Sequence, residues 1–509
     1  MWGARFVMKG EILVHRRIAL SIVAAAAALV ISAAAATSAG AALQAPEKAA
    51  SSAASGTPAC TYPDSTAASP HVQPFIHCYT AADIRTAYGV AGLTEKGDGQ
   101  TIVLVDSYGS PTAAQDLQTF HDTFFPSEPA PNFTAVFPNG QLDYNNTAKG
   151  NGQSGPAAAA NWAGEATLDI EWAYAIAPHA HIVLLAVPPA ETEGVQGFPT
   201  LFKGISQEID ATPSGTVFSM SFGVTEQTFG GAAQVQTSKF DAVFQKGIAK
   251  GDSFFASSGD SGSLGVAKQH RDTATYSFPV DGWPASSPYV TAVGGTQLQY
   301  GWTWNPQSDI AFNADGSFNP AYWGWTAGGN LNVVWNESWL PAATGGGPSA
   351  IYGRPSWQST LPGQGNHRLV PDVAWNAAVN GGVLVYTSFF PNVNRVGWHI
   401  YGGTSAGSPQ VAALTALAAQ RAGHGLGNVD SAIYGSGGAW FTDVNPIHEG
   451  SPSVISGELT TNRMFDYNGD GLPVSWDAVP GWPTLSSYDM TTGWGTPWAP
   501  SYVTGLAGH

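Results

Sequence analysis

The sequence predicts an α/β protein with a mostly parallel central sheet, helices on both faces and long surface loops. From Tyr79 onward, short apolar runs bounded by glycine alternate with amphipathic stretches of helical period. This alternation is typical of parallel strands joined by crossover helices. Only 11% of the residues are charged, whereas the chain contains 61 Gly and 35 Pro, which indicates a folded protein rich in loops. No internal repeat of about 20 to 50 residues is visible, which argues against a repeat array.

The predicted elements alternate in type along the chain. We expect strands at 101–105, 181–186, 217–222, 253–257 and 290–293, and helices at 163–177 and 238–250. Ligands of parallel sheets bind beyond the carboxyl ends of the strands, so polar residues at those ends are the candidates for chemistry.

The N-terminal segment has the pattern of an export signal. Basic residues at 15–17 precede an apolar run at 18–36, and small residues follow at 37–41. The run is about long enough to span a bilayer, so an uncleaved membrane anchor is the alternative. We therefore expect a signal peptide at 1–44, an Ala/Ser/Pro-rich linker or short pro-segment at 45–75, and one folded domain at 76–509. The protein is then secreted and extracellular.

The charge balance and the cysteine content indicate which partners and which environment suit the protein. The chain has 19 Lys+Arg and 36 Asp+Glu, a net charge of −17, which argues against nucleic acid as a partner. Cys60 and Cys78 are its two cysteines, and export favours a disulfide between them, with two free thiols as the alternative. The small number of charged groups fits a protein that works in acid. We expect a monomer without stable membrane association once the signal is removed.

The first motif with chemical content is GGTSAGSP at 402–409, followed by an Ala-rich apolar stretch. A Gly-rich turn that leads into a buried helix places Ser405 at the helix N-terminus, where N–H groups and the dipole favour negative charge. Pro409 is compatible with the first turn of that helix because its missing N–H would have no partner there. The alternative is a Ser/Thr cap on a core helix.

The second motif is a pair of carboxylates, Glu165 and Asp169, spaced i, i+4 on one face of a predicted helix. Two such groups without an adjacent Lys or Arg normally repel each other. One of them can serve as a general base while the other orients it and shares its proton. An ordinary solvated acidic turn is the alternative. Glu171 lies on another face of the helix.

The third motif is SSGDSG at 257–262, which places Asp260 after an apolar strand, at the carboxyl edge of the predicted sheet. A carboxyl group there can donate a hydrogen bond to an oxyanion only when it is protonated, which again points to acid pH. An Asx turn is the alternative.

Together the three motifs resemble the sedolisin family of serine-carboxyl peptidases. Weaker matches at 217–223, 290–296 and 371–373 occur in the same order, and the resemblance covers roughly residues 76–509. It implies a subtilisin-like α/β fold and a peptidase domain at 76–509. It also implies a secreted, acid-acting serine-type endopeptidase, or a tripeptidyl-peptidase, that cleaves protein or peptide substrates.

The resemblance also assigns a role to each site residue. Ser405 is implied as the nucleophile, Glu165 as the general base, Asp169 as the partner of that base and Asp260 as the oxyanion-hole acid. Ser405 would attack a peptide carbonyl, pass its proton to Glu165 and form an acyl-enzyme that water hydrolyses.

A C-terminal calcium-binding region is implied by the same resemblance. Its ligands would be Asp443, the Val444 carbonyl, Asp489 and the carbonyls of Leu485 and Ser487, which stand where the family usually has glycines. Such oxygen ligands are those that Ca²⁺ prefers. A second Ca²⁺ site is suggested by the D-x-N-x-D-G spacing of four further residues, with a surface turn as the alternative. These residues are Asp466, Asn468, Asp470 and Asp477.

Three other interpretations were weighed against this one. A subtilisin with a His-based triad would use Asp106 as its acid, but no His-Gly-Thr-His-like stretch follows it, and His179 and His181 fit a strand entry. A catalytically inactive or binding-only relative is the second alternative. A polysaccharide-acting protein, which would use some of the 18 Trp for stacking, is the third. It gives Ser405 and Asp260 no role, and we expect the Trp-rich segment at 302–325 to form surface loops.

One feature departs from the family pattern. Members commonly carry a large folded pro-domain between signal and peptidase, and the segment at 45–75 is too short for an independent domain. Either the enzyme folds without such a domain or a separate chaperone assists its folding, and the short segment leaves open whether the chain is an active enzyme.

Overall fold

In the computed structural model, strand β4 (Thr101–Ser107) lies inside the central sheet and is buried along its whole length. Ile102 and Leu104 belong to one hydrophobic core, whereas Val103 and Val105 belong to another. Successive side chains of a strand point to opposite faces, so the sheet separates the two cores. A continuous Val/Ile/Leu run is typical of a parallel strand that is covered on both faces.

The structure describes the residue ranges 43–44, 61–63, 75–140, 156–187, 191–265, 276–304, 323–337, 342–361, 365–389, 396–444, 460–464 and 479–509.

The central sheet is mixed, with parallel pairing in its interior. Its strand order is β12-β11-β9-β7-β4-β6-β5, and β17 also pairs with β11. The pairs β5/β6, β6/β4, β4/β7, β7/β9, β9/β11 and β11/β17 are parallel, and β11/β12 is antiparallel. The bounds are β5 Asn132–Val136, β6 His181–Val187, β7 Val217–Met220, β9 Ser253–Ser257, β11 Thr291–Trp304, β12 Trp323–Val334 and β17 Val373–Asn376. The α/β prediction is confirmed, with one antiparallel edge that the alternation of strands and helices did not indicate.

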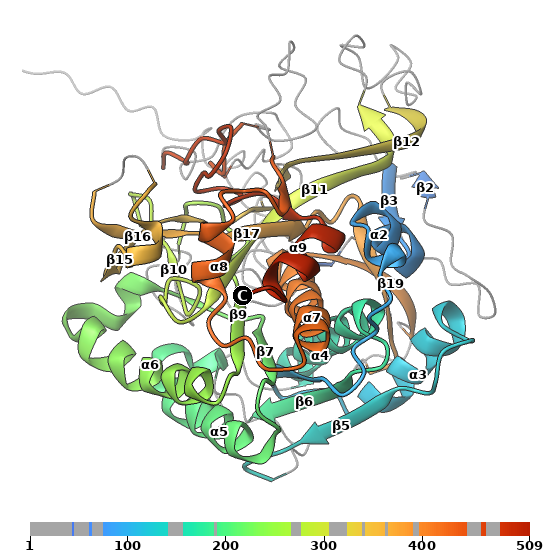
Figure 1. Ribbon diagram of the computed structural model, residues 1–509, viewed down its shortest axis with the longest axis horizontal. Helices are drawn as coiled ribbons and strands as arrows, with labels where there is room; N and C mark the ends of the chain where they lie inside the picture. Colours follow the sequence, from blue (N-terminus) through green and yellow to red (C-terminus); the bar gives the residue numbers. More distant parts are fainter. Residues whose placement is uncertain are drawn as a thin grey trace, which may run out of the picture.

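Helices cover both faces of this sheet (Figure 1). On one face, α4 (Pro156–Ile176) and α7 (Thr404–Ala422) pack against each other and against the interior strands. On the other face, α5 (Phe198–Ala211) and α6 (Ala233–Ala249) supply an aromatic core around Trp283. The site residues on α4 and α7 therefore share one layer of the molecule.

A second sheet leads the chain into α7. Its order is β1-β19-β18-β3-β2, where β1 is Leu43–Gln44, β2 Thr61–Pro63, β3 Phe75–Tyr79, β18 Gly382–Thr387 and β19 Gly397–Gly402. β19 ends at Gly402, two residues before α7 begins.

The remaining described elements are short or peripheral. The helices are α2 Ala81–Ala87, α3 Ala113–Phe124, α8 Asp430–Gly435 and α9 Ala499–Leu506. The 3₁₀ segments are η2 Val90–Gly92, η3 Glu191–Gln196, η4 Glu226–Ala232 and η5 Ser356–Gln358. The short strands are β8 Val224–Thr225, β10 Gly282–Trp283, β13 Asn336–Glu337, β14 Ala342–Ala343, β15 Gly347–Gly353, β16 His367–Val370, β20 Phe441–Thr442 and β21 Thr496–Pro497.

Every predicted strand and helix is present, but several limits differ. α4 begins at Pro156, before the predicted residue 163, because proline and alanine are favourable in a first helical turn. β11 continues from the predicted 290–293 stretch to Trp304, because β12 provides an antiparallel partner. The expectation of loops around the Trp-rich segment is wrong at this hairpin, where Trp302 pairs with Trp325 and Trp304 with Trp323.

The N-terminal predictions fall mostly outside the described residues. Within the predicted signal and linker, β1 and β2 are described, whereas Cys60 is not, so the disulfide to buried Cys78 stays a prediction. In the described part of the chain, no helix has the length and apolar character needed to cross a membrane.

Candidate active site

Ser405 is the second residue of α7 and is buried, with 1% of its surface exposed. Two glycines make this entry to the helix. Gly403 has φ +97°, a backbone conformation that residues with a Cβ rarely adopt. A Cβ at Gly402 would lie 2.7 Å from the carbonyl oxygens of Ala377 and Ala378. The tight turn therefore requires glycine, and it delivers Ser405 to a helix N-terminus as predicted.

Pro409 lies deeper in α7 than we expected. The helix begins at Thr404, so Pro409 is in its second turn rather than its first. In a regular helix the amide of residue 409 would donate to the carbonyl of Ser405, and proline has no N–H. The hydroxyl of Ser221, just after β7, lies 3.5 Å from that carbonyl oxygen.

Glu165 and Asp169 lie on α4, one turn apart, and both are fully buried. They are therefore not part of a solvated acidic turn. Ser221 Oγ lies 3.0 Å from Asp169 Oδ1, so one hydroxyl contacts both the carboxyl pair and the backbone of Ser405. Burial, followed by the charges of Asp106 and Glu165, raises the pKa of Asp169 well above its usual range.

Asp106, considered above only as the acid of a His-based triad, is a member of this carboxyl cluster. It lies near the carboxyl end of β4 and is fully buried. Within the described residues, neither of its carboxyl oxygens has a hydrogen-bond partner. Burial raises the pKa of Asp106 to about 8. Its position at the carboxyl edge of a parallel strand is the sequence signal that could have placed it in the site.

Asp260 follows β9 and is held by the residue that precedes Ser405. The backbone N–H and the hydroxyl of Thr404 each donate to Asp260 Oδ1 at 2.8 Å. Burial raises the pKa of Asp260 to about 6, although both Thr404 bonds act in the opposite direction. A pKa in this range keeps the carboxyl protonated in mild acid and able to donate a hydrogen bond.

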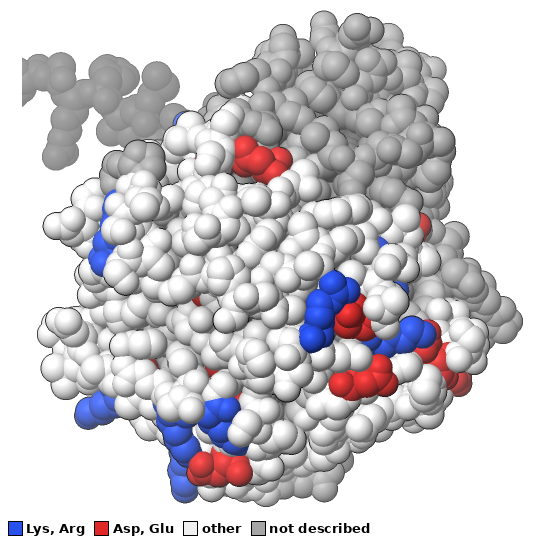
Figure 2. All heavy atoms as spheres, in the orientation of Figure 1, with Lys and Arg blue, Asp and Glu red and all other residues white. Residues whose placement is uncertain are grey.

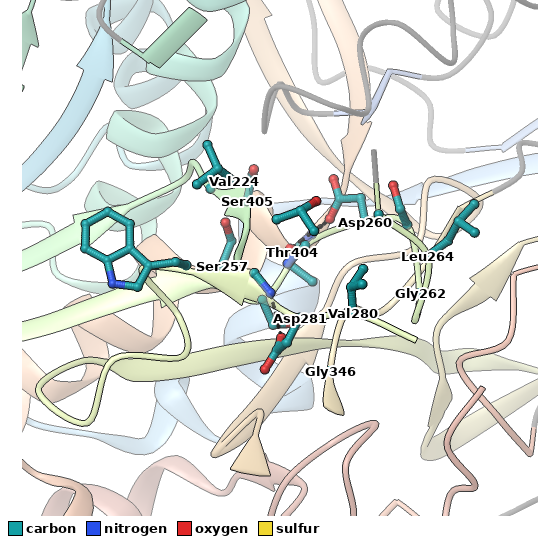
Figure 3. Close-up of a pocket in the computed structure, with 18 residues that line it drawn as sticks. Val224, Ser257, Asp260, Gly262, Leu264, Val280, Asp281, Gly346, Thr404 and Ser405 are labelled. Carbon is teal, nitrogen blue, oxygen red and sulfur yellow. Dashed lines mark hydrogen bonds between the residues drawn. The ribbon is translucent and has the colours of Figure 1, made fainter. Parts of the chain in front are cut away.

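Asp260, Thr404 and Ser405 line the same pocket (Figure 3). Its walls come from the segments after β7, β9 and β14, from β8 and β10, and from the start of α7. Among the lining residues are Gly223, Val224, Ser257, Ser258, Leu264, Val280, Asp281, Trp283 and Gly346. A peptide bond in this pocket would meet the serine hydroxyl and the Asp260 carboxyl together.

The histidines named in the sequence analysis lie elsewhere. His181 begins β6, where it pairs with Thr101 at the amino end of β4. His179 is bonded to Asp98 at 2.8 Å and Glu128 at 2.9 Å. Asp106 is near the opposite end of β4, so these residues do not form a triad with it.

The predicted calcium ligands lie near one another around a C-terminal turn. Ser487 N–H donates to Asp443 Oδ2 at 2.7 Å, and Leu485 N–H donates to Asp489 Oδ2 at 2.9 Å. Ser487 has φ +68° in this turn, and Val444 is buried. Asp443 Oδ1 is buried and has no hydrogen-bond partner in the described part of the chain. Two carboxylates bonded to the same turn, with one buried oxygen left over, fit a hard cation such as Ca²⁺.

The second calcium prediction is not tested by this structure. Asp466, Asn468, Asp470 and Asp477 lie outside the described residues. Within the described ranges, no group of three or more His, Cys, Asp or Glu side chains has an arrangement that could hold a metal ion. The predicted calcium site at Asp443 is compatible with this, because most of its metal ligands would be backbone carbonyl oxygens.

The chain is similar to several characterised peptidases. It is 30% identical to sedolisin from Pseudomonas sp. (strain 101) over 269 residues, 50% of this chain and 38% of that protein. It is 29% identical to kumamolisin from Bacillus sp. (strain MN-32) over 429 residues, 82% of this chain and 62% of that one. Tripeptidyl-peptidase 1 from Macaca fascicularis is 28% identical over 361 residues, 67% of this chain and 51% of the relative. The chain thus spans less than two thirds of each relative, and no family model matches it.

A solved structure shows the same fold. Pseudomonas sedolisin, a serine-carboxyl proteinase complexed with two molecules of pseudo-iodotyrostatin, aligns with a TM-score of 0.59 at 23% identity. The alignment covers 84% of this chain and 98% of that one. Fold and site together define a subtilisin-like α/β protein whose helix-terminal serine lies near buried carboxyl groups. In its motifs, in its similarity to sedolisin and kumamolisin, and in its fold, the chain resembles the sedolisin family of serine-carboxyl peptidases.

Proposed function

We propose that this chain is a secreted serine-type endopeptidase that hydrolyses protein and peptide substrates in acid. The observation that carries the proposal is the pocket in which Ser405, at a helix N-terminus, faces the same space as the carboxyl of Asp260. The hydroxyl of Ser221 lies between the Ser405 backbone carbonyl and Asp169 of the buried carboxyl cluster. The similarity to sedolisin and kumamolisin supports the same activity.

In this mechanism the Ser405 hydroxyl attacks the carbonyl carbon of a peptide bond while Glu165 accepts its proton. The developing oxyanion accepts a hydrogen bond from protonated Asp260. Glu165 returns the proton to the leaving amine, and the acyl group stays on Ser405. Water then loses a proton to Glu165 and attacks the ester carbon. The bond from that carbon to the Ser405 oxygen breaks, Glu165 returns the proton to the Ser405 oxygen, and the acid is released. Asp169 takes part of the proton charge and orients Glu165.

The pH range follows from the state that each carboxyl must have. Glu165 must be ionised to accept the serine proton, whereas Asp260 must be protonated to donate to the oxyanion. The pKa of Asp260 is about 6, so activity should fall as the pH rises through this value. On the face drawn in Figure 2, charged side chains are few and lie in small groups, so acid protonates few surface pairs.

A bound Ca²⁺ ion would have a structural role in this proposal. Asp443 and Asp489 would supply carboxylate oxygens, and Val444, Leu485 and Ser487 would supply carbonyls. The ion would add fixed oxygen coordination between the residues that follow β20 and the turn before β21. It takes no part in the peptide hydrolysis. The disulfide Cys60–Cys78 belongs to the same secreted state.

The first test is hydrolysis of a denatured protein from pH 2.5 to 8 by the exported chain, compared with Ser405→Ala and Glu165→Gln. We expect activity only in acid and its loss in both variants. Activity that peaks near neutrality, or survives Glu165→Gln, would exclude the serine-carboxyl mechanism. No activity at any pH would instead favour a binding-only relative.

A second substrate is needed to distinguish internal cleavage from removal of tripeptides. One relative is named tripeptidyl-peptidase 1, and sedolisin is described as a serine-carboxyl proteinase, so both modes are compared. An internally quenched peptide with an acetylated N-terminus can be cut by an endopeptidase but not by an enzyme that needs a free amino terminus. Cleavage of the acetylated peptide at the rate of its free counterpart is the expected result, and release of tripeptides from the free peptide alone contradicts it.

A further inference from the structure

Thr404 contacts Asp260 and Gly259, and it bonds only one of the two carboxyl oxygens of Asp260. Its N–H and its hydroxyl both donate to Oδ1, at 2.8 Å each. The same hydroxyl accepts the N–H of Gly259 at 3.1 Å, so it is fixed at both ends. Oδ1 therefore acts as a double acceptor, which is the role of the carbonyl oxygen of a carboxylic acid.

The other carboxyl oxygen faces the start of α7. A Cβ built on Gly403 would lie 2.7 Å from Asp260 Oδ2 and 3.6 Å from Oδ1, so Oδ2 is the oxygen closer to the Cβ position of Gly403. Since Oδ1 already accepts two hydrogen bonds, the acid proton belongs on Oδ2. The proton is then on the oxygen that lies closer to Gly403 and is not bonded by Thr404.

We propose that Thr404 is a positioning residue that keeps the proton of Asp260 on Oδ2, where it can be donated to the oxyanion. This inference rests on the proposed peptidase function and deepens it. Thr404 does not touch the reacting atoms in this account. It fixes which oxygen of the acid is a donor and where that donor lies.

The same contact has a measurable effect on pH dependence. A donor bonded to a carboxylate stabilises its charged form, and both Thr404 bonds lower the pKa of Asp260. Loss of the hydroxyl therefore leaves the acid protonated to higher pH. A Thr404 variant should be a poorer catalyst that stays active further toward neutral pH, a combination that simple loss of structure does not produce.

Other ionisable groups near the pocket must be considered in this test. Asp281 lines the same pocket, and the N–H of Glu226 donates to its carbonyl at 3.0 Å. Burial and the charge of Glu226 raise the pKa of Asp281, whereas the charge of Arg368 lowers it. On the α4 side lie Glu165 and Asp169. A change from threonine to valine alters none of these side chains.

The experiment measures kcat and KM of the full exported chain from pH 2.5 to 8 with an internally quenched peptide. The variants are Thr404→Val, which keeps the shape and removes the hydroxyl, Thr404→Ala, and Thr404→Ser, which keeps the hydroxyl. Thr415→Val is a matched control because Thr415 is also buried on α7 and its hydroxyl bonds the Val411 carbonyl and Tyr502.

We expect Thr404→Val to lower kcat by about ten- to a hundredfold with little change in KM, because a donor is misplaced in the transition state. Its alkaline limb should move to higher pH by about half a unit or more. Thr404→Ser should restore both quantities, and Thr415→Val should keep the wild-type pH profile.

An unshifted or lowered alkaline limb in Thr404→Val, or no restoration by serine, would overturn the inference. If both the valine and the alanine variants fail to fold, the role of Thr404 is structural and the inference is also wrong. Failure of the proposed function is distinguishable, since the wild type would then show no acid activity that Ser405→Ala removes.

Discussion

Asp169 on α4 and Asp106 near the end of β4 are both fully buried, and burial together with the charge of Asp106 raises the pKa of Asp169. Together with Glu165 they form a cluster of three acids that cannot all be ionised without a large electrostatic penalty. The cluster must therefore hold protons under working conditions. This relationship connects the proposed catalysis with the stability of the fold.

Replacing Asp106 by asparagine should stabilise the protein at neutral pH and leave it unchanged in acid. The folded-state pKa of Asp106 is about 8, well above its unfolded value near 3.8. Its protonated form thus contributes stability that is complete below about pH 4 and is lost as the pH rises through 8. Asparagine is always neutral, so the variant should be more stable than the wild type by about 1–3 kcal/mol of unfolding free energy at pH 7. Thermal unfolding at pH 4 and pH 7 measures it, and an equal effect at both values contradicts the account.

The whole protein should be more stable in acid than near neutrality. Burial raises the pKa of Asp241 and Asp252 to about 6 and that of Asp430 to about 8, so each adds to the loss of stability as the pH rises through its folded value. Surface carboxylates with lowered pKa values, such as Glu95 beside Arg421, act the other way but are worth little. The measurement is the unfolding midpoint of Ser405→Ala, which avoids self-digestion, from pH 3 to 8. A midpoint that is highest near pH 7 would show that these buried carboxyls do not determine how stability depends on pH.

Ser221→Ala should slow the reaction and move the acid limb of activity to higher pH. The Ser221 hydroxyl lowers the pKa of Asp169, so without it the carboxyl cluster ionises only at higher pH. We expect a rate loss of about tenfold and a stability loss of about 1 kcal/mol. Ser219→Ala is the control, because Ser219 lies two residues earlier and bonds Ser408 at 2.9 Å. An acid limb that shifts equally in both variants would assign the effect to packing.

Gly403→Ala should abolish most of the activity. The new Cβ would lie 2.7 Å from Asp260 Oδ2 at a backbone with φ +97°, so the oxyanion acid must move. We expect kcat to fall by about a hundredfold or more, with destabilisation of about 1–3 kcal/mol. Gly423→Ala, at the other end of α7, has φ +75° and open space around its Cβ. It should lose stability and keep its kcat, and a similar loss of kcat would contradict the proposed contact.

Removal of calcium should lower the unfolding midpoint and leave the catalytic mechanism unchanged. Asp443 Oδ1 is buried without a partner in the described structure, so an ion there would satisfy it. Addition of Ca²⁺ to the chelated protein should raise the midpoint, and Asp443→Asn should remove the response. Asp210→Asn, which loses an exposed ion pair to Lys246, is the control that keeps it. Equal responses in both variants would exclude Asp443 as a ligand.

Much of the fold could be predicted because the local patterns are strong. The run of apolar residues in β4 and the alternation of strands with helices require a sheet covered on both sides. The extent of β11 could not be predicted in the same way. Its outer half is a strand because β12 pairs with it across a long hairpin, and pairing partners distant in sequence leave no local signal.

The candidate site shows the same division. The sequence by itself determined the helix-terminal serine, the i, i+4 carboxyl pair and the acid after β9, because each depends on local geometry. Only the tertiary structure decided that Asp106 joins the carboxyl cluster, that Ser221 connects Asp169 to the backbone of Ser405, and that Thr404 holds one oxygen of Asp260. These relationships join separate strands and helices, and the burial that raises the carboxyl pKa values exists only when those elements pack together.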